Sequence, residues 1–224
     1  MSEHPVIARL FASNAQWAAD VDQAEPEFFT ELAQGQSPPV LWIGCADSRV
    51  PESVITGSRP GTIFVLRNIA NQFHLDDDSA LSALTYAVDH LGVEHVVVVG
   101  HSECGGASAC FNAAPSYTSG EPCATLAGLS PEEAINKWLY PVTALAASLH
   151  LSSAPKEEAL PILIEENVKM QVDNLSQTPA ITNAWKNKNG KGKDVYIHGW
   201  VFDLASGRLK DLRVSRGPPS PSRP

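Results

Sequence analysis

The amino-acid sequence predicts an α/β fold: a mainly parallel β-sheet flanked by helices, with an N-terminal helical arm and a C-terminal hairpin. Two features lead to this fold class. Short apolar runs alternate with amphipathic segments along the middle of the 224-residue chain, and such alternation builds parallel sheets with right-handed crossovers. The last strand-like runs are instead joined by the short turn ASG, which is typical of a hairpin.

The chain has the length of one domain with a substantial core, and we see no internal linker. We therefore expect a single domain over residues 1–214, in which residues 1–35 form the helical arm. Residues 215–224 end in GPPSPSRP, a composition typical of a disordered tail.

The first expected elements are the helices of the arm, IARLFASNAQWAADV and EPEFFTELAQ. Pro26 suits the start of the second helix, because proline is tolerated in the first turn. Three short, continuously apolar runs then predict strands that are covered on both faces. These runs are Val40–Gly44, Thr62–Leu66 and His95–Gly100.

Helices are expected between and after these strands. One covers residues 76–92, where acidic residues open an amphipathic pattern and Gly92 ends it. Another begins near Gly105. A long helix over residues 157–177 and a hairpin of residues 194–204 with 208–214 complete the predicted fold.

Residues 130–140 carry the signals of a further helix start. Ser130 is expected to be the cap, Pro131 to occupy the first helical position, and Glu133 to close a capping box. Because proline lacks the backbone N–H that a helix interior needs, we expect Pro141 to kink or end this helix.

Composition excludes several classes of function. The formal charge of -9 and the pI near 5.2 argue against nucleic acid as a partner, because binding to a phosphate backbone needs a basic face. The four lysines of KNKNGKGK are expected to lie in a solvated turn. No apolar run is long enough to span a bilayer, and the N-terminus lacks a secretory signal. We therefore expect a cytoplasmic protein with no membrane partner, whose four cysteines are thiols or metal ligands rather than disulfides.

The residues that carry chemistry follow the ends of two expected strands. Cys45 follows the first strand, and His101 and Cys104 follow the third. Because ligands bind beyond the carboxyl ends of parallel strands, the three side chains meet if both strands lie in one sheet. Two thiolates and an imidazole suit zinc. Three protein ligands leave one coordination position open, which distinguishes a catalytic zinc site from a structural one.

Cys110 and Cys123 are the candidates for a fourth ligand, and we expect neither to bind. Cys110 falls about two turns into the helix that begins near Gly105, and Cys123 lies in a loop without a recognisable pattern. Taken alone, Cys45 has an alternative interpretation as a small buried hydrophobic residue. Its combination with a second strand end favours a metal site.

Asp47 and Arg49 alternate with Cys45, so in extended backbone all three side chains point the same way. The guanidinium of Arg49 is suited to bind the Asp47 carboxylate with two hydrogen bonds, which would fix its orientation and keep it ionised. The alternative is an ordinary structural ion pair.

The segments CADSRV and HSECGG together resemble the signatures of the β-class carbonic anhydrases, a C-x-D-x-R segment followed by an H-x-x-C-G-G segment. FVLRNIANQF and HGWVFDLASGRL are also similar to that family, and the resemblance extends from about Gln36 to Val214. The segment RNIANQ looks closest to fungal or plant-like members.

The resemblance implies one zinc ion per chain, held by Cys45, His101 and Cys104, with Asp47 and Arg49 as the catalytic pair beside it. It also implies substrate-binding residues: a glutamine that donates a hydrogen bond, two aromatic residues that line an apolar wall, and two glycines whose backbone approaches the substrate. These residues are Gln36, Phe64, Tyr86, Gly105 and Gly106. Without the resemblance, the two aromatic residues are equally well explained as core residues, and the glutamine as an ordinary loop residue.

The implied activity is the reversible hydration of carbon dioxide to bicarbonate and a proton. Zinc lowers the pKa of bound water from about 9 towards about 7, so a zinc-bound hydroxide attacks carbon dioxide. In this scheme Asp47 accepts the hydrogen of the hydroxide, Arg49 holds Asp47, and Gln36 with an amide of Gly105 steadies the product. No histidine outside the ligand set stands out as a proton shuttle.

We also expect a homodimer or homotetramer. The arm carries apolar residues on a face that needs covering, among them Ile7, Leu10, Phe11 and Trp17. The resemblance implies the same assembly, and it would place Gln36 at a site shared between chains.

Two other functions are compatible with the same ligands. An enzyme acting on carbonyl sulfide or carbon disulfide would differ only in the shape of its channel, whereas a noncatalytic zinc-binding module would need the fourth metal position filled. A cysteine-dependent phosphatase is excluded, because Pro51 stands six residues after Cys45, where such an enzyme needs an arginine.

Overall fold

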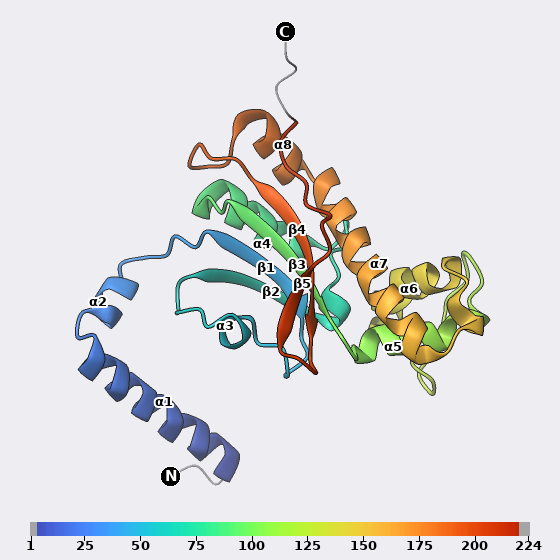
Figure 1. The fold of residues 1–224 in the computed structure, drawn as a ribbon, viewed down its shortest axis with the longest axis horizontal. Coiled ribbons are helices and arrows are strands. Elements are labelled where there is room, and N and C mark those ends of the chain that lie inside the picture. The colour runs from blue at the N-terminus through green and yellow to red at the C-terminus, as the bar shows by residue number, and fades with distance from the viewer. Residues whose placement is uncertain (1–3, 220–224) are drawn as a thin grey trace. The chain divides into compact units, whose positions relative to one another are not determined.

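The computed structural model describes residues 4–219, apart from the side chain of Ser152. It divides the chain into two compact units, residues 1–36 and residues 37–224 (Figure 1). The first unit contains the two helices predicted for the arm, and the second contains the sheet and every other helix. Among the described residues, no helix is both long and apolar enough to cross a bilayer.

The first unit consists of α1 (Pro5–Ala24) and α2 (Phe28–Leu32). Trp17 of α1 and Phe29 of α2 pack edge to face, with ring centroids 5.6 Å apart. No residue of α1 is buried, and Leu10 and Phe11 expose 63% and 72% of their surface. Within its own unit, the apolar face of this helix is therefore not covered.

The second unit is built on a five-stranded sheet with the strand order β2-β1-β3-β4-β5. The first four strands in this order are parallel, and β5 is antiparallel to β4. This arrangement confirms the predicted α/β class and the closing hairpin. The strands are β1 (Val40–Cys45), β2 (Ile63–Asn68), β3 (His95–His101), β4 (Tyr196–Asp203) and β5 (Arg208–Asp211).

Helices follow the strands and cover the sheet (Figure 1). The α-helices of the second unit are α3 (Glu52–Ile55), α4 (Asp78–Thr85), α5 (Gly105–Ala113), α6 (Ala134–Ser148), α7 (Lys156–Gln177) and α8 (Pro179–Asn187). Short helical turns are η1 (Ile69–Asn71), the π-helical η2 (Tyr86–Leu91), η3 (Ala114–Ser116) and η4 (Leu151–Ser153). The helix predicted over residues 76–92 is thus α4 continued by η2, and it ends at Gly92 in the left-handed conformation, as expected.

Two apolar clusters hold the second unit together. In the first, Ile43, Val98 and Ile197 of the sheet pack against α4, α8 and the second half of α7. In the second, α5, α6 and the first half of α7 pack beyond the carboxyl ends of β1 and β3, around Leu139 and Leu163; Figure 1 shows these three helices side by side. The site described below lies in the second cluster.

The predicted start of α6 was wrong by three residues. Glu133, not Ser130, precedes the first helical residue. The Ser130 carbonyl accepts hydrogen bonds from the Glu133 amide and from the buried side chain of Asn136, so it is engaged in a turn instead of a first helical bond. Pro141 does not end the helix, which continues through it to Ser148. Packing of Leu139 and Val142 in the core offsets the lost backbone bond.

Two further segments differ from their predictions. Residues Ser215 and Arg216 were expected in a disordered tail, yet Arg216 pairs with Ile197 of β4 through two backbone hydrogen bonds; residues 220–224 lie outside the described part of the chain. In KNKNGKGK the lysines are exposed as expected, but Asn189 is buried and donates to the Val93 carbonyl at 3.0 Å. That loop is therefore anchored to the fold rather than merely solvated.

Candidate metal centre

Cys45, His101 and Cys104 meet at the carboxyl edge of the sheet, as the sequence predicted. Cys45 ends β1, His101 ends β3, and Cys104 immediately precedes α5. One ligand atom from each residue lies within 4.8 Å of the other two, and all three side chains are buried. This is the spacing at which one metal ion binds three ligands.

The donor set fits zinc. Nδ1 of His101 bonds to the Ser102 carbonyl at 2.8 Å, which leaves Nε2 as the ligand atom. In the described part of the chain, this buried Nε2 has no hydrogen-bond partner. A buried nitrogen without a partner, beside two thiol sulfurs, matches the mixed sulfur and nitrogen coordination that zinc prefers.

The protein stabilises a negative sulfur at this site. The Cys104 thiol donates to the Cys45 sulfur, and with His101 and the backbone amides of Asp47 and Ala70 it lowers the pKa of Cys45 to about 4 against the opposing effect of burial. The same hydrogen bond, together with burial, raises the pKa of Cys104. Metal binding requires both cysteines as thiolates. A metal cation at this site would take the place of the proton that Cys104 shares with Cys45.

Asp47 and Arg49 form the bidentate pair that the alternation predicted. Nε and Nη2 of Arg49 donate to the two carboxylate oxygens of Asp47 at 3.0 and 2.7 Å, and the Arg49 amide donates to Oδ1 at 2.9 Å. The Arg49 hydrogen bonds hold the pKa of Asp47 well below its usual range. Oδ2 of Asp47 lies 3.8 Å from Nε2 of His101, so the oriented carboxylate is next to the metal ligands.

Cys110 and Cys123 stay apart from the metal ligands, as expected. Both are buried free thiols, and neither belongs to the three-residue cluster formed within residues 4–219. Burial raises the pKa of Cys110 to about 11, which makes it a poor ligand. Within the described chain, the cluster therefore has three protein ligands and not the four of a closed structural site.

Gly105 and Gly106 are the first residues of α5, directly after Cys104. The backbone amides of Gly106 and Ala107 approach the Cys104 sulfur, so the positive end of the helix faces the site. The two glycines differ in their surroundings. A Cβ on Gly105 would have no heavy atom within 4 Å, whereas a Cβ on Gly106 would lie 3.1 Å from Cγ2 of Ile69 and 3.2 Å from Cβ of Ala70.

Phe64 and Tyr86 form a pair that the structure places away from the metal ligands of the same chain. Their ring centroids are 6.0 Å apart. Phe64 pairs with Leu41, four residues before Cys45 on β1, which corresponds to roughly 13 Å along the strand. Tyr86 exposes 47% of its surface. Gln36 is exposed and belongs to the first compact unit, outside the unit that contains the metal ligands.

Arg67 is a site residue that the sequence reasoning missed. Its Nε donates to the Cys45 carbonyl at 2.9 Å, and its Nη2 donates to the Asp47 carbonyl at 2.6 Å. Glu52 faces Nη1 at 3.7 Å. The sequence contains one signal for this role: Arg67 is a charged residue near the end of an otherwise apolar strand. In the sheet it is in register with Gly44.

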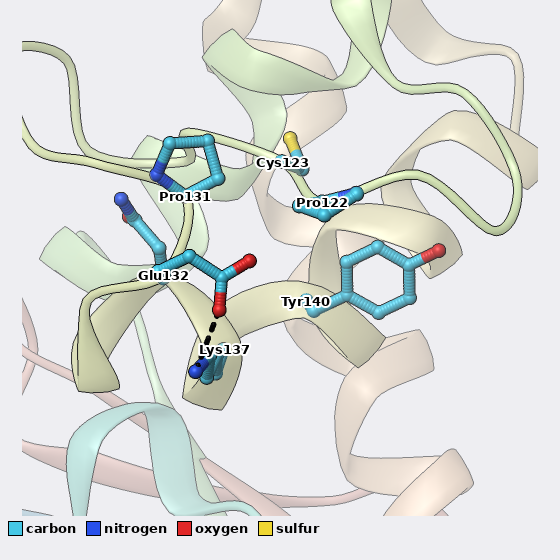
Figure 2. A pocket seen from close by; sticks show the side chains of 7 residues that line it. Pro122, Cys123, Pro131, Glu132, Lys137 and Tyr140 are labelled. Carbon is cyan, nitrogen blue, oxygen red and sulfur yellow. Dashed lines mark ion pairs between the residues drawn. The ribbon is translucent and has the colours of Figure 1, made fainter.

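Two cavities differ in their relation to the metal site. A mainly apolar cavity of 560 Å³ is lined by Ala46, the residue after Cys45, and its wall includes Ile69, Ile135 and Trp138. The pocket in Figure 2 has a volume of 280 Å³ and contains the ion pair of Lys137 with Glu132. None of the residues that line the pocket in Figure 2 is a predicted site residue, so the apolar cavity is the better candidate for a substrate path.

A buried cysteine-histidine-cysteine cluster with an adjacent, oriented carboxylate, at the carboxyl edge of a parallel sheet, defines a zinc enzyme. Comparison with known proteins gives the family. The carbonic anhydrase family profile matches residues 40–209. A carbonic anhydrase of Emericella nidulans is 38% identical over 92% of this chain and 83% of its own length, and one of Pseudomonas aeruginosa is 34% identical over 86% and 81%.

Solved structures agree with this result. A tetrameric β-carbonic anhydrase of Sordaria macrospora matches with a TM-score of 0.80 and 33% identity over 95% of this chain and 100% of that one. A β-carbonic anhydrase of Aspergillus fumigatus matches with a TM-score of 0.78 and 36% identity over 93% and 91%. The chain belongs to the β-carbonic anhydrase family, as its motifs indicated. It is a zinc-dependent enzyme of carbon dioxide hydration.

Proposed function

We propose that Cys45, His101 and Cys104 hold the zinc ion and that Asp47 and Arg49 act beside it in the reversible hydration of carbon dioxide to bicarbonate and a proton. One observation carries this proposal: a carboxylate fixed by two guanidinium hydrogen bonds lies 3.8 Å from Nε2 of His101. A purely structural metal site has no use for such a group.

When bound, zinc supplies a water molecule whose pKa is lowered to near 7, so that a nucleophile exists at neutral pH. Asp47 stays ionised, because Arg49 occupies both of its oxygens. It accepts the hydrogen of the attacking oxygen and thereby directs the free lone pair towards carbon dioxide. The mainly apolar cavity lined by Ala46 suits a nonpolar substrate.

The start of α5 stabilises the product. The amide of Gly105 lies in the first turn of the helix, where N–H groups without a helical partner and the helix dipole favour negative charge. The developing bicarbonate gains charge on its oxygens, so the Gly105 amide and the helix dipole act more strongly on the transition state than on neutral carbon dioxide.

Two variants test these roles. Cys104→Ser is expected to lose zinc, because a serine hydroxyl is a poor zinc ligand; zinc retained at wild-type affinity would exclude Cys104. Asp47→Asn keeps the shape but removes the anionic acceptor, so it is expected to retain zinc and lose about a hundredfold or more in kcat/KM. Turnover of carbonyl sulfide and carbon disulfide by the wild-type protein, compared with that of carbon dioxide, decides between the related activities.

We further propose that the active form is a homodimer or homotetramer in which Gln36, Phe64 and Tyr86 complete the site of a neighbouring copy. Phe64 and Tyr86 are displaced along the sheet from the metal ligands of their own chain, and the Sordaria relative is tetrameric. Mixing two inactive variants tests this. Cys104→Ser and Tyr86→Ala chains should regain activity when assembled together, because mixed oligomers contain one intact composite site. Failure of the mixture to exceed the sum of its parts would place each site within one chain.

We also propose a cytoplasmic location. All four cysteines are free thiols, which suits a reducing compartment. Fractionation of cells that produce the untagged protein tests this proposal, and recovery with organelles or in the medium would contradict it.

A further inference from the structure

The loop that follows β2 has an unusual backbone. Ala70 and Asn71 are consecutive residues in the left-handed region, with φ of 63° and 47°. Neither is a glycine, so this conformation is strained for both. Both residues are buried, and contacts with the rest of the protein must therefore hold the loop in this shape.

This loop lies directly against the metal site. Ala70 packs in the same buried cluster as Cys45 and Cys104, and its backbone amide is among the groups that lower the pKa of Cys45. On its other side the loop faces the start of α5, where a Cβ on Gly106 would come within 3.2 Å of Cβ of Ala70. A shift of the Ala70 backbone would therefore change the environment of one metal ligand and of the helix that follows another.

Side chains from α7 hold the loop. Nδ2 of Asn167 donates to the Ala70 carbonyl at 2.9 Å, and Oδ1 of Asn167 accepts from Nε2 of Gln171 at 2.8 Å. Oε1 of Gln171 accepts from the Phe73 amide at 2.9 Å, and Nδ2 of Asn174 donates to the Phe73 carbonyl at 2.9 Å. We call Asn167, Gln171 and Asn174 the amide ladder.

The amide ladder is largely buried, and a buried amide destabilises the folded protein unless its polar atoms form hydrogen bonds. Asn167 and Gln171 expose only 2% and 0% of their surface, and their neighbours on α7 include the core residues Val168 and Leu175. If α7 only packed against the core at these positions, apolar side chains would be sufficient. Buried amides are stable only with hydrogen-bond partners, and every backbone group bound by the ladder belongs to residues 70–73.

We propose that Asn167 and Gln171 are positioning residues for the metal site, which fix the left-handed loop so that the Ala70 amide stays against the Cys45 sulfur. They act through Ala70 and touch neither metal nor substrate. The inference rests on the role proposed above for Cys45 as a zinc ligand.

The test replaces the amides by apolar groups of similar shape. Asn167→Leu leaves the Ala70 carbonyl unpaired, and Gln171→Met leaves the Phe73 amide unpaired, so the loop relaxes. We expect the zinc affinity of the purified protein to fall tenfold to a hundredfold. In cobalt-substituted protein, the sulfur-to-metal absorption bands should shift, while the far-ultraviolet circular dichroism is retained. Gln171→Met gives an independent measurement if Asn167→Leu does not fold.

Three controls separate positioning from general destabilisation. Asn183→Leu on α8 and Gln177→Met on α7 repeat the same chemical changes at exposed positions and should leave zinc affinity unchanged. Val172→Ala removes a buried core contact of α7; it should lower the melting temperature without changing the cobalt spectrum. Wild-type zinc affinity in both ladder variants, or an equal loss of affinity in Val172→Ala, would show that the ladder is only structural. Wild-type protein that fails to bind zinc would instead overturn the proposed function.

Discussion

Arg67 illustrates how one side chain holds the backbone of an active site. It donates to the carbonyls of Cys45 and Asp47, so it fixes the spacing between a metal ligand and the catalytic carboxylate. Glu52 is its counterion and is itself largely buried. Loss of the cation would remove the side-chain donor to the Cys45 carbonyl and the counterion of Glu52, and the Asp47 carbonyl would keep only the hydrogen bond from the Val50 amide at 3.2 Å.

We therefore predict that Arg67→Met lowers the free energy of unfolding by roughly 2–4 kcal/mol, because it leaves a buried charge unpaired, and that it lowers kcat/KM at least tenfold. The double variant Arg67→Met with Glu52→Gln should recover part of the stability, since the unpaired charge is removed, but none of the activity. Urea unfolding and carbon dioxide hydration provide the two measurements. Recovery of activity in the double variant would mean that Arg67 serves only to neutralise Glu52.

Arg49 has a different part, because it orients a side chain and not the backbone. Arg49→Ala should retain zinc and lose roughly a hundredfold in kcat/KM, since Asp47 loses the two hydrogen bonds that aim it. Arg49→Lys should recover little of this activity, because an ammonium group cannot replace a planar fork. Zinc content and stopped-flow hydration are the measurements, and full activity of Arg49→Lys would show that only the positive charge matters.

The residues of the site divide into those that local sequence could reveal and those that it could not. Cys45, Asp47 and Arg49 lie within five residues, so strand alternation alone predicted their common direction, and the pairing of β1 with β3 brought His101 to them. The contact between Asn167 and Ala70 spans 97 residues. No local pattern predicts such a contact, because an asparagine on a helix is usually solvated.

The start of α5 packs against the η1 loop on one side, while the amide ladder of α7 binds the loop by hydrogen bonds. Gly105 and Gly106 are adjacent, yet only a Cβ added to the second would come within 3.2 Å of Ile69 and Ala70. Ala70 is held in a strained conformation, so it has little freedom to move away from an added methyl group.

The two glycines therefore provide a matched test. We predict that Gly105→Ala changes the free energy of unfolding by less than about 1 kcal/mol, and that helix propensity makes the change favourable. Gly106→Ala should instead destabilise the protein by roughly 1–3 kcal/mol through overpacking. Thermal unfolding with and without a metal chelator measures both. Equal stabilities of the two variants would show that the loop yields and is not rigid.

The helices show which boundaries sequence patterns predict and which they do not. The segment over residues 76–92 was predicted correctly because acidic residues, an apolar stripe and Gly92 all agreed. The start of α6 was misplaced because Asn136 reaches back to the Ser130 carbonyl, a tertiary bond that overrides a good capping sequence. The short helix α8 was not predicted, although Thr178 caps it and Pro179 begins it. It follows directly on the long helix α7, which ends at Gln177.

On the scale of the whole molecule, α1 is the feature that a single chain leaves unexplained. It is 20 residues long without a buried side chain, and Leu10 and Phe11 are largely exposed. Isolated helices gain most of their stability from packing of an apolar face. We infer that a second copy of the chain supplies such a surface, which connects the arm to the composite site proposed for Gln36, Phe64 and Tyr86.

We therefore predict that the purified protein sediments as a dimer or higher even oligomer, and that the double variant Leu10→Glu with Phe11→Glu dissociates. Burying the two side chains contributes at least about 3 kcal/mol, which corresponds to a roughly hundredfold weaker association. Ala12→Glu, an exposed position on the opposite side of α1, is the matched control and should leave the assembly intact. Because the composite site needs a neighbour, the dissociated double variant should retain zinc but lose activity. A wild-type monomer with full activity at nanomolar dilution would refute this, since each chain would then hold a complete site and the arm would have another purpose.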